Sequence, residues 1–168
     1  MKTRRERTTL LIMKRSLHAI AAVLLLALFA VSCQTAPIAQ RERRVDRLLW
    51  EINRASLDRL MELSARPFLL DGEIIVLESD LEMMWTNLQN AGFTFDTPTL
   101  RDLGPVDENT WRRFGETMDV RVWFERYTAE DAGLAEVRTS HGTFLIVTGD
   151  RVPGHLPKIF GFTGPQED

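Results

Sequence analysis

The sequence predicts an α+β domain in which helices pack on a curved, mostly antiparallel sheet. Over residues 41–64 and again over 80–91, apolar residues recur every three or four positions, which is the spacing of amphipathic helices. From Asp119 onward they alternate at every second position, as in strands with one buried face. Glycines and prolines separate the later apolar runs and indicate turns. Helices first and antiparallel strands last is the order typical of α+β domains.

The first 32 residues have the composition of a secretory signal peptide. Basic residues come first, and an apolar stretch of 13 residues, AIAAVLLLALFAV, runs from Ala19 to Val31. This stretch is shorter than the roughly 20 residues that span a bilayer as a helix. The small residues Ala30 and Ser32 then mark the end of the segment. A cleaved signal is therefore favoured over a permanent membrane helix.

Cys33, the only cysteine of the chain, directly follows this segment. The junction Ala30-Val31-Ser32-Cys33 resembles the lipobox of bacterial lipoproteins, although that family prefers leucine where this chain has Ala30. The resemblance implies a palmitate-type lipid on the Cys33 sulfur and, because Gln34 follows, sorting to the periplasmic side of the outer membrane. The alternatives are ordinary secretion, with Cys33 lost in the signal, and a catalytic thiol, which a signal boundary disfavours.

Residues 33–40 are expected to form a lipidated tether containing Pro37, and residues 41–168 a single domain. Six basic residues and one acid precede Cys33, so totals of 21 and 24 leave 15 basic and 23 acidic residues and a net charge of about −8. An acidic domain of this kind lacks the basic surface on which nucleic-acid binding depends. Membrane attachment through lipid is thus expected, and a nucleic-acid partner is not.

The first expected helix covers residues 41–64. Apolar residues fall on one stripe and charged residues cover most of the remaining surface. The stripe consists of Val45, Leu48, Leu49, Ile52, Leu60 and Leu63. Pro67 follows shortly after the expected end of the helix.

A hairpin and a second helix come next. Asp71-Gly72 lies between two apolar runs in PFLLDGEIIVLES, which is a tight-turn signal. Ser79 and Glu82 have the spacing of a capping box, and an apolar face then predicts a helix over 80–91 that stops at Gly92. That face consists of Leu81, Met84, Trp85 and Leu88.

The rest of the chain is expected to be a short turn followed by strands. Asp107 or Asn109 is expected to cap a turn that carries Trp111, Phe114 and Met118 inward. Alternation predicts a strand over 120–125, ending near Tyr127. Further strands are expected in LAEVRTS, GTFLIVTG and PKIFGFTG, with a turn at Pro153-Gly154 before the last.

This order of elements resembles the cone-shaped fold of nuclear transport factor 2 and SnoaL-like proteins, the NTF2-like superfamily. The segment PFLLDGEII, the following helix and the final Lys158-Ile159-Phe160-Gly161-Phe162 carry the likeness, over about residues 42–164. The resemblance implies a cone with an interior cavity open at one end, and a homodimer across the outer face of the sheet. It implies no single activity, because the fold hosts dehydratases, isomerases, cyclases and catalytically silent binding modules.

Candidates for catalysis are few. Enzymes that resemble this fold place an Asp-His pair, or a tyrosine with acids, inside the cone to move a proton. The weak candidates here are His141, His155, Tyr127 and Asp96. Both histidines stand in turn-like, glycine-adjacent segments, for which surface loops are the favoured location. No metal-ligand spacing, phosphate loop or nucleophile triad occurs, so no cofactor or metal is expected.

Four tryptophans and two phenylalanines are candidates for the interior. Core packing is favoured for Trp50, Trp85, Trp111 and Trp123, and Trp85, Phe93, Phe95 and Trp123 are the residues expected to line a cavity if one exists. The sequence therefore favours a non-catalytic, lipid-anchored protein that binds a small apolar ligand or an envelope partner. The alternatives are a small dehydratase or isomerase with a histidine-carboxylate pair, and a structural protein whose outer sheet is the working surface.

Overall fold

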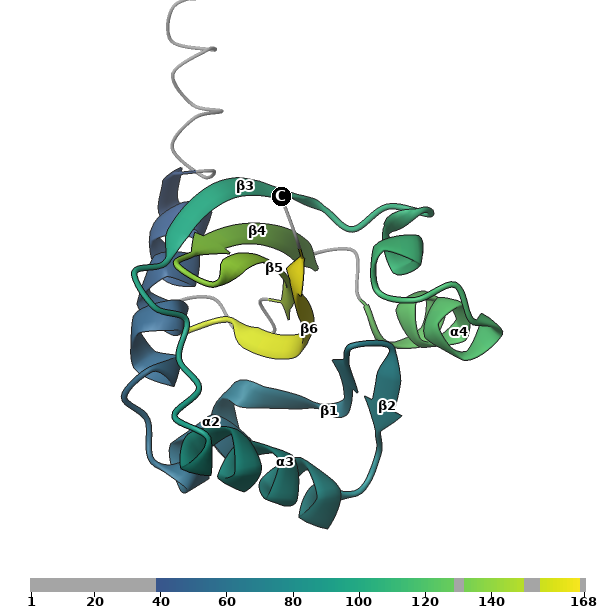
Figure 1. Ribbon diagram of the computed structural model, residues 1–168. Helices are drawn as coiled ribbons and strands as arrows, with labels where there is room; N and C mark the ends of the chain where they lie inside the picture. Colours follow the sequence, from purple (N-terminus) through teal and green to yellow (C-terminus); the bar gives the residue numbers. More distant parts are fainter. Residues whose placement is uncertain (1–38, 129–131, 150–154, 167–168) are drawn as a thin grey trace, which may run out of the picture. The chain divides into compact units, whose positions relative to one another are not determined.

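The computed structural model describes residues 39–128, 132–149 and 155–166. Six strands form one curved sheet in the order β2-β1-β6-β5-β4-β3 (Figure 1). Their bounds are β1 Ser64–Leu70, β2 Glu73–Ile75, β3 Thr99–Pro105, β4 Gly133–Thr139, β5 Gly142–Gly149 and β6 Lys158–Gln166. All neighbours are antiparallel except β1 and β6, which are parallel. The α+β class with a curved, mostly antiparallel sheet is confirmed.

Three helices pack on the concave face of this sheet. They are a helix over 39–52, α2 Leu57–Leu63 and α3 Glu78–Asn90. The apolar stripe expected for the first helix is buried, and it joins inward-facing residues of the strands in one cluster. This cluster contains Leu48, Leu49, Leu60, Leu63, Phe68, Leu81, Trp85, Val137, Phe144, Ile146 and Phe162, among others.

The expectation of one unbroken helix over 41–64 is wrong, because the helix is interrupted at residues 53–56. Asn53 leaves the helical pattern to bond the backbone of Phe95: its side-chain amide donates to the Phe95 carbonyl at 2.9 Å and its carbonyl oxygen accepts from the Phe95 N–H at 2.8 Å. Ser56 then caps α2, since its hydroxyl accepts from the Arg59 N–H. Helix periodicity alone does not reveal a break in which the apolar stripe continues on both sides.

Replacing Asn53 with alanine is expected to destabilise the domain by about 1–3 kcal/mol, because it leaves a part-buried amide and carbonyl of Phe95 without their partner. Urea unfolding followed by tryptophan fluorescence measures the loss. Asn90→Ala, at the exposed end of α3, is the matched control and should change the midpoint little. Equal midpoints for the two variants would contradict the bridging role of Asn53.

The predicted hairpin is confirmed, with Asp71 and Gly72 as its two-residue turn between β1 and β2. Their φ angles are 47° and 85°, so both residues lie in the left-handed region that a type I′ turn requires. At Gly72 a Cβ atom would also lie 2.9 Å from the Phe114 carbonyl oxygen. Glycine is therefore required there both by the backbone angle and by the approach of another segment.

The second predicted helix exists as α3 but begins earlier than expected. Its N-cap is Leu77, which makes no side-chain capping bond, and Ser79 bonds Asp80 inside the first turn. The predicted Ser79–Glu82 capping box is therefore wrong. The predicted inner face is right, since Leu81, Met84 and Trp85 are buried, and the helix ends before Gly92 at φ 70°. The Phe93 N–H bonds the Leu88 carbonyl across this end, as in a Schellman motif.

A second layer of helices covers part of the convex face of the sheet. It contains the 3₁₀ turn η1 Thr110–Arg113 and α4 Met118–Tyr127. The strand predicted over 120–125 is wrong: Thr117 caps a helix there, and Val120, Trp123 and Phe124 form its buried face. A short run with apolar residues at 120, 122, 123 and 124 satisfies both periods, and only packing on the sheet decides between them. Met118, expected to point inward, is 67% exposed.

Because both faces are covered, the central strand β5 is buried along almost its whole length. Phe144 and Ile146 face the concave cluster, whereas Leu145 and Val147 face the convex one. The convex cluster also contains Ala65, Leu69, Phe114, Val120, Trp123, Phe124, Leu134 and Phe160. The strands predicted in LAEVRTS, GTFLIVTG and PKIFGFTG are confirmed as β4, β5 and β6.

Asp107 fixes the turn that begins η1. Its carboxylate accepts from the Thr110 hydroxyl at 2.8 Å and from the Asn109 N–H at 2.9 Å, and these bonds lower the pKa of Asp107, the Thr110 bond having the larger effect. A pKa lower in the folded than in the unfolded state contributes stability above the usual value of 3.8, and this stability is lost as the pH falls through the folded pKa.

We therefore expect Asp107→Asn to flatten the acid limb of the stability profile below about pH 4. Thermal unfolding of wild type and variant between about pH 2.5 and pH 7 measures this difference. Asp58→Asn, which removes an exposed carboxylate elsewhere, serves as the control. Parallel acid limbs for wild type and Asp107→Asn would contradict the assignment.

One strand was not expected from the sequence. β3 contains the charged residues Arg101 and Asp102, and its first and last residues are exposed. It forms one edge of the sheet, and β2 forms the other edge. Because this segment contains few apolar residues, alternation of apolar and polar residues does not predict it as a strand. The predicted signal peptide, the tether up to residue 38, and the turn at Pro153-Gly154 lie outside the described residues.

Candidate functional site

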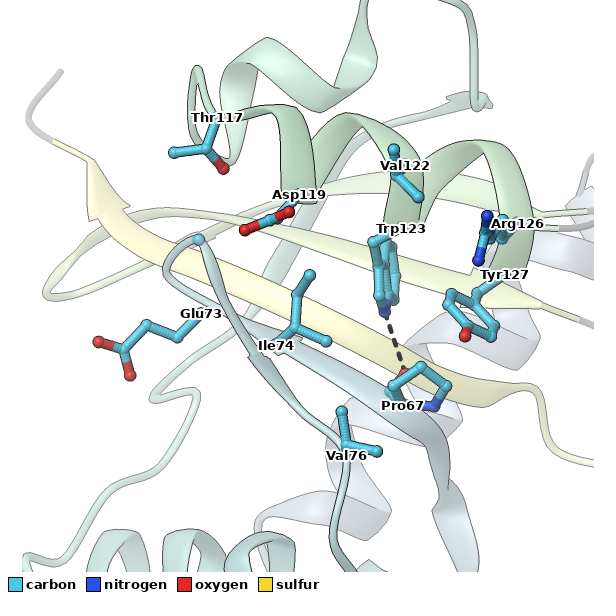
Figure 2. Close-up of a pocket in the computed structure, with 11 residues that line it drawn as sticks. Pro67, Glu73, Ile74, Val76, Thr117, Asp119, Val122, Trp123, Arg126 and Tyr127 are labelled. Carbon is cyan, nitrogen blue, oxygen red and sulfur yellow. Dashed lines mark hydrogen bonds between the residues drawn. The ribbon is translucent and has the colours of Figure 1, made fainter.

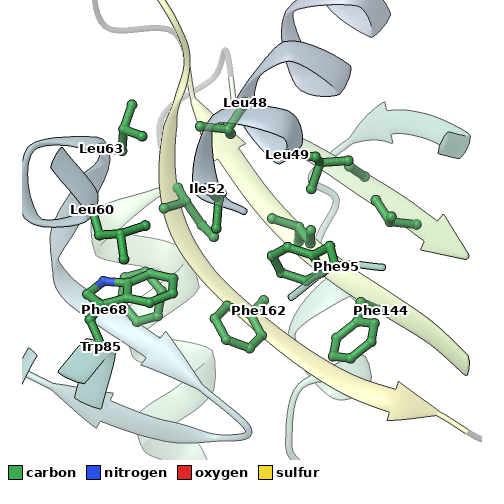
Figure 3. Packing of buried hydrophobic residues seen from close by; sticks show 14 of the residues in the cluster. Leu48, Leu49, Ile52, Leu60, Leu63, Phe68, Trp85, Phe95, Phe144 and Phe162 are labelled. Atoms are coloured by element: carbon green, nitrogen blue, oxygen red, sulfur yellow. The ribbon is translucent and has the colours of Figure 1, made fainter. Parts of the chain in front are cut away.

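Aromatic side chains fill the concave face of the sheet (Figure 3). Phe162 of β6 lies at their centre, with its ring centroid 5.7–6.5 Å from those of five other aromatic residues. These five are Phe68, Trp85, Phe93, Phe95 and Phe144. Most pairs meet edge to face, a geometry that aromatic rings favour. The rings therefore pack directly against one another on this face of the sheet.

Three of the predicted lining residues belong to this cluster. Trp85 and Phe95 are buried, and Phe93 is half-buried. The indole N–H of Trp85 donates to the Ser64 hydroxyl at 2.9 Å, and that hydroxyl donates to the Leu60 carbonyl at 2.8 Å. The one polar atom that Trp85 brings into the core is thus satisfied within it.

The catalytic candidates do not come together on the aromatic face of the sheet. His141 stands in the two-residue turn between β4 and β5, and His155 precedes β6; both are exposed, as expected. Asp96 is exposed and accepts from the Ser140 hydroxyl at 2.8 Å, which brings it beside the turn of His141. Asp96, Ser140 and His141 are all exposed. The burial that would prepare Asp96 to act as a base is therefore missing.

Tyr127 is the last residue of α4. It was expected at the end of a strand, and it is 40% exposed. Its ring contacts Trp123, with centroids 6.4 Å apart. Tyr127 therefore belongs to the convex side of the sheet and not to the aromatic interior.

Neither a metal centre nor a membrane span appears among the residues that the structure describes. In those ranges, no three His, Cys, Asp or Glu side chains are grouped to hold a metal ion. Likewise, no helix within them is long and apolar enough to cross a bilayer.

Trp123, the fourth residue expected to line a cavity, lies on the opposite face of the sheet from the other three. It is buried beneath α4, and its indole N–H donates to the Pro67 carbonyl at 3.2 Å. Figure 2 shows it in the wall of a groove of about 700 Å³ between α4 and the β1–β2 hairpin. We call this the α4 groove; it is lined by Pro67, Gly72, Glu73, Ile74, Val76, Thr117, Asp119, Val122, Trp123, Arg126 and Tyr127.

A second groove, of about 690 Å³, lies between β2 and α3. We call it the α3 groove; it is lined by Leu70, Glu73, Ile74, Ile75, Asp80, Met83, Met84, Asn87, Leu88 and Ala91. Glu73 and Ile74 of β2 contribute to both grooves. The short edge strand β2 is therefore flanked by a hollow on each side.

Apolar side chains around β2 are unusually exposed. Val76 is 63% exposed, Leu77 60% and Met83 59%. This surface was not expected from the sequence, although a signal was present: the apolar run IIVL continues two residues beyond the three-residue strand. Exposed apolar residues gathered in one place are typical of interaction surfaces.

The fold and these surfaces define an α+β protein with a filled aromatic interior and exposed grooves beside an edge strand. In comparisons with known proteins, no family model, curated protein or solved structure matches the chain.

Proposed function

We propose that this chain is a lipid-anchored protein of the bacterial envelope whose NTF2-like domain is a non-catalytic binding module for an envelope partner. The observation that carries the proposal is the filled concave face. An enzyme of this fold needs polar groups that converge on an open cavity, whereas here six aromatic rings occupy that space.

The NTF2-like assignment is supported by the order of the elements. A helix over 39–52, the β1–β2 hairpin and α3 precede the later strands, and the final strand Lys158–Gln166 lies between β1 and β5. The segment Lys158-Ile159-Phe160-Gly161-Phe162, which carries the sequence resemblance, supplies residues to both apolar clusters. These features are compatible with a cone whose interior is closed by side chains.

A partner protein is favoured over a small apolar ligand as the bound molecule. A ligand in the cone would have to displace buried rings such as Phe95 and Phe162. The outer sheet face that a homodimer would use is covered in part by η1 and α4. The exposed apolar surface lies instead around β2, where a macromolecular partner can reach it.

The membrane attachment rests on the junction Ala30-Val31-Ser32-Cys33 and on the position of Gln34. Lipidation would hold the acidic domain at the inner surface of the outer membrane, because two or more acyl chains make attachment stable. Metabolic labelling with a palmitate analogue tests this attachment. Wild type is expected to be labelled and to fractionate with outer membranes, and Cys33→Ser is expected to lose both properties.

Unlabelled wild-type protein free in the periplasm would contradict the lipid anchor. Dehydratase or isomerase activity that disappears in His141→Ala or His155→Ala would contradict the non-catalytic role. The two results are independent, because lipidation concerns Cys33 and catalysis would concern the domain.

A further inference from the structure

We infer that the outer edge of β2 binds an extended segment of the partner protein, which adds a strand to the sheet. The segment would carry apolar side chains at its centre and basic residues at its ends. This inference deepens the proposed binding function and rests on it. The contacts, exposure and charge of the residues around β2 support each part of it.

The backbone of β2 has unused hydrogen-bonding groups at its edge. In a two-residue hairpin the residues that flank the turn, Leu70 and Glu73, exchange both of their hydrogen bonds. Antiparallel pairs alternate, so Ile74 opposite Leu69 points its N–H and C=O away from β1. β2 is the last strand of the sheet on this side, and an added strand would extend the pairing toward Val76.

The two grooves suit the alternating side chains of a strand. Successive residues of an extended segment point to opposite faces of a sheet. A segment paired with Ile74 would therefore direct one side chain into the α4 groove and the next into the α3 groove. Val76 and Met83, both more than half exposed, would be covered by these side chains.

The charges around the grooves specify the ends of the bound segment. Among the residues that line the two grooves, there are three exposed carboxylates, Glu73, Asp80 and Asp119, and one exposed guanidinium, Arg126. A segment that ends in lysine or arginine complements this rim, whereas an acidic one is repelled. A second copy of this chain is disfavoured as the occupant, because it would bring the same carboxylates and a domain charge of about −8 against each other.

The test uses the full-length chain in lipid nanodiscs and a fluorescein-labelled peptide, KTVLVTK, with binding followed by fluorescence anisotropy. Two matched peptides isolate the two parts of the inference. ETVLVTE keeps the apolar centre and reverses the charge, and N-methylation of the central VLV keeps side chains and charge but removes three backbone donors.

KTVLVTK is expected to bind saturably. At low salt ETVLVTE should bind at least fivefold more weakly, and the N-methylated peptide at least tenfold more weakly, because it loses backbone bonds to the edge strand. Glu73→Gln combined with Asp119→Asn should weaken KTVLVTK binding about threefold to tenfold, since each exposed charge pair contributes modestly. Glu42→Gln combined with Glu82→Gln changes the net charge equally, away from the grooves, and should leave binding unchanged.

Three outcomes would overturn the inference. They are the absence of saturable binding, equal binding of the N-methylated peptide, and a concentration-dependent dimer whose formation excludes KTVLVTK. A failure of Cys33 labelling with intact peptide binding would reject the anchor alone. Intact labelling without peptide binding would reject the β2 edge and leave the proposed class of protein standing.

Discussion

Replacing Gly161 with alanine is expected to destabilise the domain by about 3 kcal/mol, because the added methyl group has no space. A Cβ atom at Gly161 would lie 2.2 Å from the Leu69 carbonyl oxygen and 2.7 Å from the Leu69 Cβ. The Leu69 carbonyl oxygen is part of the β1 backbone, and the Leu69 Cβ is bonded directly to it. Rotation of the Leu69 side chain therefore cannot relieve the overlap. The parallel pairing of β1 with β6, in which Leu69 opposes Gly161, would have to open.

Urea unfolding followed by tryptophan fluorescence measures this effect, with the change in midpoint at constant slope giving the change in the free energy of unfolding. Gly104→Ala is the matched control: it is also a strand glycine, but the nearest atom to its added Cβ lies 4.0 Å away. We expect the control to be neutral or slightly stabilised, because alanine restricts the unfolded chain. A Gly161→Ala midpoint as high as that of Gly104→Ala would show that β1 and β6 can separate freely.

The Gly161→Ala substitution is also expected to affect binding at the edge of β2. Among the described strands, β2 pairs with β1, and β1 in turn pairs with β6. A variant that loosens the β1–β6 pairing should therefore also reduce peptide binding at β2, in proportion to the loss of folded protein.

Local sequence signals predicted some elements well because those elements are determined locally. The β1–β2 turn depends on two residues that accept positive φ, and Asp71-Gly72 supplies them. β5 and β6 contain short apolar runs bounded by glycines or prolines, and such runs are typical of buried strands. Part of α4 was predicted as a strand because its short apolar run over 120–124 satisfies both periodicities, and packing on the sheet selects the helix.

Other features depend on residues that are distant in the chain. The helix break at 53–56 follows from two hydrogen bonds between Asn53 and Phe95, 42 residues apart. No local pattern indicates such a partner. The sequence also identified Trp85, Phe93 and Phe95 as interior residues, but only the structure shows that all three pack against Phe162. Trp50, expected in the core, is 55% exposed, with the Arg54 guanidinium 4.2 Å from its ring.

The grooves beside β2 were missed for a related reason. The α4 groove combines the edge strand β2 with a helix more than 40 residues further along the chain, and the α3 groove depends on how α3 packs beside β2. Exposure of Val76, Leu77 and Met83 is visible only once β2 is placed at the edge. The filled interior and these exposed residues support the same interpretation, in which this domain works through its surface.

Phe162→Ala tests the filled interior directly, and it is expected to destabilise the domain by about 3–5 kcal/mol. The cost arises because five neighbouring rings lose the ring at their centre and cannot all close the gap. Because domains are stable by about 5–15 kcal/mol, a folded population should remain measurable. Trp50→Ala, which removes a larger ring from the surface, is the control and should cost about 1 kcal/mol or less.

The cavity left by Phe162→Ala would be lined by aromatic and aliphatic groups, and such a cavity binds benzene. Benzene is therefore expected to raise the unfolding midpoint of Phe162→Ala while leaving wild type and Trp50→Ala unchanged, since binding to the folded state alone stabilises it. A benzene-dependent shift in wild type would mean that its interior already holds an accessible apolar space. In that case a small apolar ligand, and not only a partner at β2, would become the favoured occupant of this fold.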